Sequence, residues 1–281
     1  MSKSTYLLIT NVWNEQDSIP SLFKTIENQT HRPAIWVWID DGSTDNSSSV
    51  IRKEGAKSSI PIQIFNLPPK KKGSLDTLGR AYNFIHSDIK ESINVDYMSI
   101  ADVDCTFPID YYKLVCDYLD EHPNVGACAG QMKGEAKRDK PMGAGKLVRW
   151  SIFKQIDEFW DLAPDSFLNI ITLSLGYDLV TIDDLEIDAE ITNIFTKRGR
   201  FRYGRVNFYI GMNFFRVLQL SLMMTLKKDD GVEFLRGYFQ EWGKNTWTTE
   251  NKTIRYFYSL EFRLRNFLKR RFSIGLHAWP R

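Results

Sequence analysis

The sequence predicts an α/β fold, in which helices cover both faces of a mainly parallel sheet. Short apolar runs alternate with helical patterns between residues 5 and 130. The runs are continuous, as in strands that are buried on both faces, and the spacing leaves room for a helix in each connection. Polar or acidic residues follow several of the runs. Such residues collect at the carboxyl ends of parallel strands, where open α/β sheets bind ligands.

The first predicted strand is the apolar run at residues 6–10. A polar loop follows, and Asp17 or Ser18 can cap the next helix, with Pro20 in its first turn. The apolar residues of this helix recur at helical spacing, so they share one face. They are Ile19, Leu22, Phe23 and Ile26.

The next two strands are predicted at residues 35–39 and 62–65, with a helix over residues 47–55 between them. A basic loop, Lys70, Lys71 and Lys72, then leads to a helix predicted from Thr77 to His86. Strand, helix, strand, helix and strand in this order predict a right-handed parallel arrangement.

The fourth predicted strand, at residues 97–101, is followed by two acids, Asp102 and Asp104. A helix at residues 111–119 and a strand at residues 125–130 complete this part of the chain. Side chains two residues apart on an extended segment point the same way, so we expect the two carboxylates to face one point. They repel each other unless a cation lies between them, and hard divalent ions prefer such oxygen ligands. The alternative is a solvated Asp-x-Asp turn.

Composition excludes some classes of function. The chain has 281 residues, 43% of them hydrophobic and 26% charged, with a net charge of +2. This balanced charge gives no indication of nucleic-acid binding. The three cysteines, Cys105, Cys116 and Cys128, match no zinc-binding spacing, and we expect them to be buried thiols of a reduced protein. The first five residues lack the build of a signal peptide, so we expect a cytoplasmic location.

The C-terminal third differs in character. Val206 to Thr225 is apolar and about 20 residues long, the length of a membrane span. Arg216 lies at its middle, where arginine costs about 2.5–3.5 kcal/mol on insertion, so we predict a buried or interfacial helix instead. Residues 252–281 are basic and aromatic, which suits the surface of an anionic membrane. Cover for the sheet and contact with a second subunit are the alternatives.

Three segments together resemble the family 2 glycosyltransferases that have a GT-A fold. The segments are residues 10–15, 39–45 and 102–104, and residues 81–83 look like a further element of that family. The resemblance implies a Rossmann-like, mixed and mainly parallel sheet with flanking helices. It assigns residues 1–205 to a GT-A domain that binds a nucleotide sugar and carries the catalytic site. Residues 206–281 would be a helical C-terminal extension.

The resemblance also implies a function. The chain would move a sugar, with inversion, from a nucleotide donor to an acceptor hydroxyl or a lipid phosphate. A UDP-sugar is favoured over a GDP-sugar. Asn11, Trp13 and Glu15 would line the nucleoside pocket, while Asp41 would accept a hydrogen bond from the base with Asp40 in support.

The resemblance places the metal and the diphosphate at the Asp-x-Asp segment. Asp102 would lie near the ribose and the metal, and Asp104 would ligate Mg²⁺ or Mn²⁺. Such an ion stabilises the negative charge of a leaving diphosphate as a Lewis acid. Arg80 and the lysines at residues 70–72 could supplement that charge, although a solvated loop explains the lysines equally well.

Inverting transfer needs a base on the acceptor side. In the family this base is the Asp of a Glu-Asp pair that opens a helix, and a glycine follows that helix. Counting back from Gly199 makes Asp188 the base, with Ile187 where Glu is usual. Asp184 and Glu186 are alternatives. The macrodipole of the expected helix also favours carboxylates at its start, so the acid cluster has a purely structural explanation as well. The double-glycine element expected upstream is not visible.

Two other functions remain open. The segment from Asp102 to Thr106 also matches the nucleophile motif of haloacid-dehalogenase-type phosphatases, with Asp102 as nucleophile and Asp104 as acid and base. That hypothesis leaves the acids at residues 40–45 unexplained. The second alternative is an inactive GT-A scaffold at a membrane. The expected partners are a nucleotide-sugar donor, a glycan or lipid-linked acceptor, a membrane surface and a second copy of the chain.

Overall fold

The computed structural model of the chain describes residues 4–69, 78–134, 140–159, 164–189, 196–244 and 249–272. The chain divides into two compact units, Met1–Glu190 and Ile191–Arg281. The division predicted between residues 205 and 206 lies inside helix α7 (Lys197–Tyr209) of the second unit.

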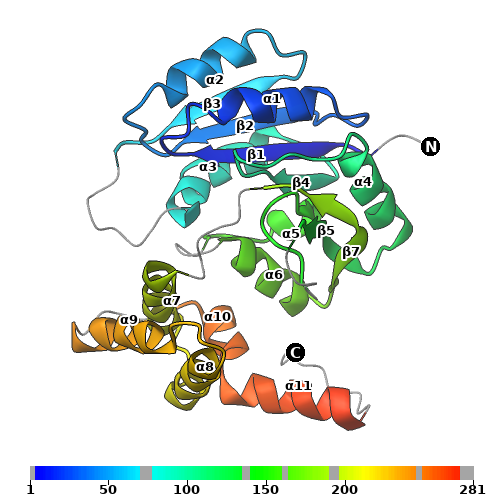
Figure 1. Ribbon diagram of the computed structural model, residues 1–281. Helices are drawn as coiled ribbons and strands as arrows, with labels where there is room; N and C mark the ends of the chain where they lie inside the picture. The colour runs from blue at the N-terminus through cyan, green and yellow to red at the C-terminus, as the bar shows by residue number, and fades with distance from the viewer. Residues whose placement is uncertain are drawn as a thin grey trace. The chain divides into compact units, whose positions relative to one another are not determined.

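The first unit contains a mixed sheet that the described residues form from seven strands (Figure 1). In space the strands follow the order β3-β2-β1-β4-β6-β5-β7. Strand β6 is antiparallel to β4 and β5, whereas the other neighbouring pairs are parallel. The strands are β1 (Tyr6–Val12), β2 (Ile35–Asp40), β3 (Ile62–Asn66), β4 (Tyr97–Ile100), β5 (Val125–Met132), β6 (Leu147–Arg149) and β7 (Asp178–Ile187).

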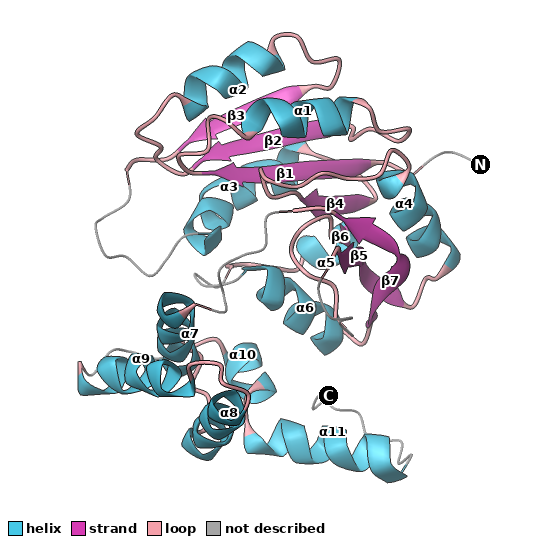
Figure 2. Ribbon diagram, viewed as in Figure 1, coloured by secondary structure: helices cyan, strands magenta, loops and turns pink. Residues whose placement is uncertain are grey.

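Helices cover both faces of this sheet (Figure 2). Apolar residues of α1, α2 and α4 pack with Trp36 and Trp38 in one core cluster. Val37 and Ile39 alternate with these tryptophans along β2 and are equally buried, because successive strand side chains point to opposite faces. The helices of the first unit are α1 (Ile19–Glu27), α2 (Ser47–Gly55), α3 (Leu78–Ser92), α4 (Tyr111–Glu121), α5 (Trp150–Phe153) and α6 (Pro164–Ser174).

The structure confirms the elements that the sequence predicts up to residue 130, with small differences at their ends. Strands β6 and β7 and helices α5 and α6 were not predicted. Strand β6 has three residues, and β7 carries exposed acids along one side, so neither gives the continuous apolar run of a doubly covered strand.

The second unit is helical in its described residues. Helices α7 and α9 (Gly231–Gly243) approach so closely that a Cβ atom at Gly204 would lie 1.9 Å from the Phe234 main-chain oxygen. A Cβ at Gly237 would equally meet the Phe201 oxygen at 1.9 Å, so both glycines are needed where the helices cross. The remaining helices are α8 (Phe214–Leu226), α10 (Lys252–Phe257) and α11 (Leu260–Phe272).

The single helix predicted from Val206 to Thr225 is wrong. Helix α7 ends at Tyr209, and Gly211 adopts a left-handed φ of 70° before α8 begins at Phe214. The Met212 N–H bonds the Asn207 oxygen at 3.0 Å, which closes the end of α7 as a glycine-containing C-cap. Within the described residues, no helix combines the length and the apolar character that crossing a membrane requires.

Candidate functional site

Strands β2, β1 and β4 are neighbours in the sheet and run parallel, so their carboxyl ends lie at the same edge. The structure therefore brings three predicted loops together at this edge. The loop after β1 carries Trp13 and Glu15, the end of β2 carries Asp40 and Asp41, and the loop after β4 carries Asp102 and Asp104. This is where open α/β sheets bind their ligands.

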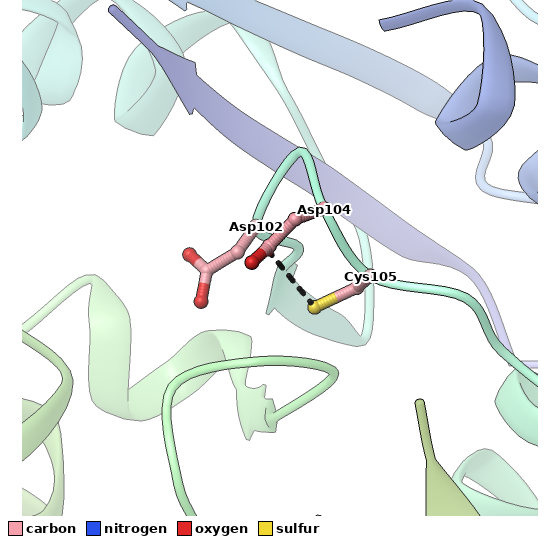
Figure 3. A group of neighbouring side chains, drawn as sticks. All are labelled: Asp102, Asp104 and Cys105. Atoms are coloured by element: carbon pink, nitrogen blue, oxygen red, sulfur yellow. Dashed lines mark hydrogen bonds between the residues drawn. The ribbon is translucent and has the colours of Figure 1, made fainter. Parts of the chain in front are cut away.

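The loop after β4 directs its acids outward by alternation. Val103, Cys105 and Phe107 are buried, whereas Asp102 and Asp104 alternate with them and lie at the rim. The ligand atoms of Asp102, Asp104 and Cys105 all lie within 4.8 Å of one another (Figure 3). The Cys105 thiol donates to Asp104 Oδ1 at 3.9 Å.

The electrostatics of this loop show an excess of negative charge. The Asp102 side chain keeps an exposed surface, but protein atoms surround its carboxylate closely enough to desolvate it. Burial, and then the neighbouring Asp104, Asp165 and Glu15 carboxylates, raise the pKa of Asp102 to about 7, against the opposing effect of Lys146. A cation at this point would offset that repulsion.

Asp41 is fully buried next to Arg80. An Arg80 Nη2 donates to Asp41 Oδ1 at 3.1 Å and to the Pro68 main-chain oxygen at 2.6 Å. Asp40 Oδ1 accepts from the Ser43 N–H, three residues further on, at 2.8 Å, which fixes the turn after β2. Arg80, which was expected to supplement charge at the diphosphate, thus lies beside the carboxylate predicted to bind the base.

The loop after β1 borders a recess of about 370 Å³ that also reaches Asp104. Glu15 lies in its wall, and its main-chain N–H donates to Ser47 Oγ at 3.0 Å. Trp13 is 48% exposed, and Asn11 sits half-buried in β1 with Oδ1 lacking a hydrogen-bond partner among the described residues. These residues offer an aromatic face and polar atoms beside the acids.

The local structure predicted around Asp188 is wrong. Strand β7 continues to Ile187, and Asp188 pairs with Thr106 through two main-chain hydrogen bonds of 2.7 and 3.0 Å. The helix expected to end at Gly199 would run mostly over residues 190–195, which lie outside the described residues, and helix α7 begins at Lys197. The acids of this segment alternate with buried apolar residues at the strand period of two, which the sequence interpretation took for a helix start.

Asp188 itself is exposed and forms an ion pair with Lys133, with 3.1 Å between Nζ and Oδ2. Asp184 and Glu186, the alternative bases, lie exposed on β7. The lysines at residues 70–72, which were expected to supplement charge at the diphosphate, lie outside the described residues.

Sequence reasoning missed Asp165, which lies half-buried in the first turn of α6. It is among the carboxylates that raise the pKa of Asp102. A signal was present, because Asp165 opens a helix that Gly176 follows, with Gly143 and Gly145 upstream. That is the order of features described for the family's base, with Pro164 in the place of Glu.

Lys146 is the buried cation of this region. It lies in the segment that enters β6, is fully buried, and donates from Nζ to the Asp165 main-chain oxygen at 2.7 Å. Burial lowers the pKa of Lys146 to about 8, although the Asp165 and Asp102 carboxylates act in the opposite direction. When protonated, Lys146 thus carries a positive charge that partly offsets the negative charge of Asp102 and Asp165.

Comparison with known proteins agrees with this architecture. The model of the family described as glycosyl transferase family 2 matches residues 8–168. The mannosyltransferase PcManGT from Pyrobaculum calidifontis, solved with GDP-Man and Mn²⁺, has a similar structure with a TM-score of 0.59 and 18% identity. The match covers 73% of this chain but only 62% of that one.

A second similar structure is S. aureus TarS 1-349 in complex with UDP-GlcNAc, with a TM-score of 0.56 and 14% identity. That match covers 96% of this chain and 73% of the TarS chain. No curated protein matches the sequence. At these identities the two structures establish a shared fold, which confirms the predicted GT-A class.

Proposed function

This chain belongs to glycosyl transferase family 2, and from that premise we propose that it transfers a sugar, with inversion, from a nucleoside diphosphate donor to an acceptor. The acceptor group is a hydroxyl or a lipid phosphate. A UDP-sugar is the favoured donor and a GDP-sugar the alternative. The observation that carries the proposal is the pair Asp102 and Asp104 at the carboxyl end of β4, beside Asp41 and Glu15 on neighbouring loops.

The residues at this rim fit a divalent metal ion. Asp102 and Asp104 supply carboxylate oxygens, which are the ligands that Mg²⁺ and Mn²⁺ prefer. The raised pKa of Asp102 reflects burial and then the negative charge of neighbouring carboxylates, and a cation would neutralise that charge. PcManGT, which shares the fold, was solved with Mn²⁺. A bound ion would stabilise the negative charge of the leaving diphosphate.

The remaining roles fall to groups of the chain. Asp41, supported by Asp40, would accept a hydrogen bond from the nucleobase, which requires its surroundings to open, because Asp41 is fully buried beside Arg80 in this structure. Exposed Trp13 offers a face on which the base can stack. Asn11 and Glu15 would complete the nucleoside pocket. These assignments agree with the resemblance of residues 10–15 and 39–45 to the family.

We propose Asp165 as the general base for a hydroxyl acceptor, with Asp188 as the alternative. The acceptor oxygen attacks the anomeric carbon, and its proton passes to the base. The bond from that carbon to the diphosphate breaks, and its electron pair leaves with the diphosphate. Asp165 is favoured because it opens α6 and acts electrostatically on Asp102, whereas Asp188 lies on an exposed strand end with Lys133.

The experiment that tests the function offers UDP- and GDP-sugars with Mn²⁺, with and without EDTA, and measures nucleotide release. We expect release from one donor that EDTA abolishes. Phosphate release from simple phosphomonoesters would instead support the phosphatase alternative. If neither product appears, the inactive scaffold is supported. The family match covers Asp102 and Asp104, which weighs against the phosphatase.

For the second unit we propose contact with an anionic membrane surface, which suits a lipid-linked acceptor. Leu260, Leu264 and Leu268 recur every four residues on α11 and are exposed, with Arg265 among them. We expect sedimentation with vesicles that contain anionic lipid and less with neutral ones. Replacing the three leucines by Ser should abolish it. A concentration-dependent dimer that the same substitutions dissociate would indicate a second copy instead.

A further inference from the structure

Asn14 joins the loop after β1 to the loop after β2. Its side-chain Oδ1 accepts hydrogen bonds from the Thr44 N–H at 2.7 Å, the Thr44 hydroxyl at 3.3 Å and the Asp45 N–H at 3.4 Å. In the reverse direction, its main-chain N–H donates to Ser43 Oγ at 3.0 Å. One residue therefore holds three consecutive residues of the second loop.

The backbone of Asn14 is adapted to this position. Its φ is 56°, in the left-handed region that asparagine tolerates better than most residues other than glycine. Asn14 lies directly between Trp13 and Glu15, two of the residues proposed for the nucleoside pocket. Its conformation therefore influences the directions in which both neighbours leave the loop.

Further hydrogen bonds link the loop after β1 to the loop after β2 beyond Asn14. The Gln16 N–H donates to Asp45 Oδ2 at 3.2 Å, and Gln16 Oε1 accepts from the Asn46 N–H at 2.9 Å. At its other end the second loop begins with Asp41, which Arg80 links to Pro68. The second loop is thus held between the loops after β1 and β3.

We infer that Asn14 is a positioning residue for the nucleotide donor. It acts through the loop that it holds, by keeping Trp13 and Glu15 at a fixed distance from Asp40 and Asp41. When the loops are already fixed before binding, less conformational entropy is lost on binding. The affinity for the nucleotide therefore depends on the hydrogen bonds that Asn14 makes between the two loops. The inference rests on the proposed function, since it concerns the donor pocket of that function.

The test compares Asn14→Gly with Asn124→Ala by calorimetry, with UDP and GDP as probes in the presence of Mn²⁺. Glycine accepts the left-handed φ, so the first variant removes the side chain without backbone strain. Asn124 is also exposed and donates to Asp178 Oδ2 at 2.8 Å, but at the amino ends of β5 and β7. It is therefore a matched loss of a side-chain bond at the opposite edge of the sheet.

We expect Asn14→Gly to bind the nucleotide about tenfold more weakly, because the acceptor of several hydrogen bonds is lost. Asn124→Ala should bind within about twofold of wild type. Hydrogen exchange should be faster at the Thr44 and Asp45 amides in Asn14→Gly. Binding by wild type together with unchanged binding by Asn14→Gly overturns the inference alone. If wild type binds neither nucleotide, the proposed function fails and the inference with it.

Discussion

The ammonium group of Lys146 lies 2.7 Å from the main-chain oxygen of Asp165, which ties the start of β6 to the first turn of α6. Lys146 is fully buried, and its neighbours include the carboxylates of Asp165 and Asp102. Removing an ammonium from water is costly unless partners compensate it. The lowered pKa of Lys146 indicates that burial outweighs these partners here.

This balance predicts how stability depends on pH. The pKa of Lys146 is about 8 in the folded chain, below the 10.5 of an ordinary lysine. Between these values the unfolded chain binds a proton that the folded chain does not, so the contribution of Lys146 to the free energy of unfolding increases with pH. Lys146→Met removes this contribution. The difference in the free energy of unfolding, variant minus wild type, should therefore decrease by about 2 kcal/mol between about pH 7.5 and pH 10.

Urea unfolding of both proteins with EDTA, at the two pH values, measures this difference. Lys133→Met serves as the control, because Lys133 is an exposed lysine whose ion pair with Asp188 lies at the surface. The control should show a change with pH below about 0.5 kcal/mol. An equal pH dependence in the Lys146 and Lys133 variants would contradict the assigned pKa.

Arg80 and Asp41 should be coupled in stability. Asp41 is fully buried, so Arg80→Met removes the guanidinium from beside a carboxylate with no access to water. We expect a loss of about 2–3 kcal/mol in the free energy of unfolding. Arg52→Met, at an arginine that bonds only neutral side chains in the described residues, should cost less than about 0.5 kcal/mol. The double variant Arg80→Met with Asp41→Asn should recover part of the loss. Additive losses would show that the pair is not coupled.

The first half of the fold could be predicted because its strands are continuous apolar runs, and the acids after them fall where ligands bind. Asp102 and Asp104 could be placed on one rim from strand order alone. Asp165 was missed because Pro164 stands where the acidic neighbour is expected, just as Ile187 does before Asp188, so this feature did not distinguish the two candidates. The acids before Asp188 also offered a competing helix start, although they alternate with Leu185 and Ile187 as in a strand. The junction at Asn14 was hidden because hydrogen bonds between loops leave no periodic pattern.

The metal role of Asp104 can be tested by binding alone. Asp104→Asn keeps the size of the side chain but removes its charge, so metal-dependent binding of UDP should fall at least tenfold while the thermal unfolding midpoint stays close to wild type. Calorimetry with UDP and Mn²⁺, with and without EDTA, measures the effect. Asp178→Asn, at the amino end of β7, is the control and should bind as wild type does. Equal affinity in Asp104→Asn would count against this carboxylate as a ligand.

Two variants distinguish the proposed general base, Asp165, from the alternative, Asp188. Asp165→Asn should lower turnover by about 10²–10⁴-fold, the usual contribution of a general base, and leave the affinity for UDP and Mn²⁺ within about threefold of wild type. Asp188→Asn should keep most of its turnover, because Asp188 is exposed and pairs with Lys133. Initial rates with the active donor, alongside calorimetry, give both quantities. If Asp188→Asn loses turnover and Asp165→Asn keeps it, the base lies at the end of β7. The Asp165 carboxylate would then stabilise the first turn of α6 and the charge of Lys146, and it would not take the proton of the acceptor.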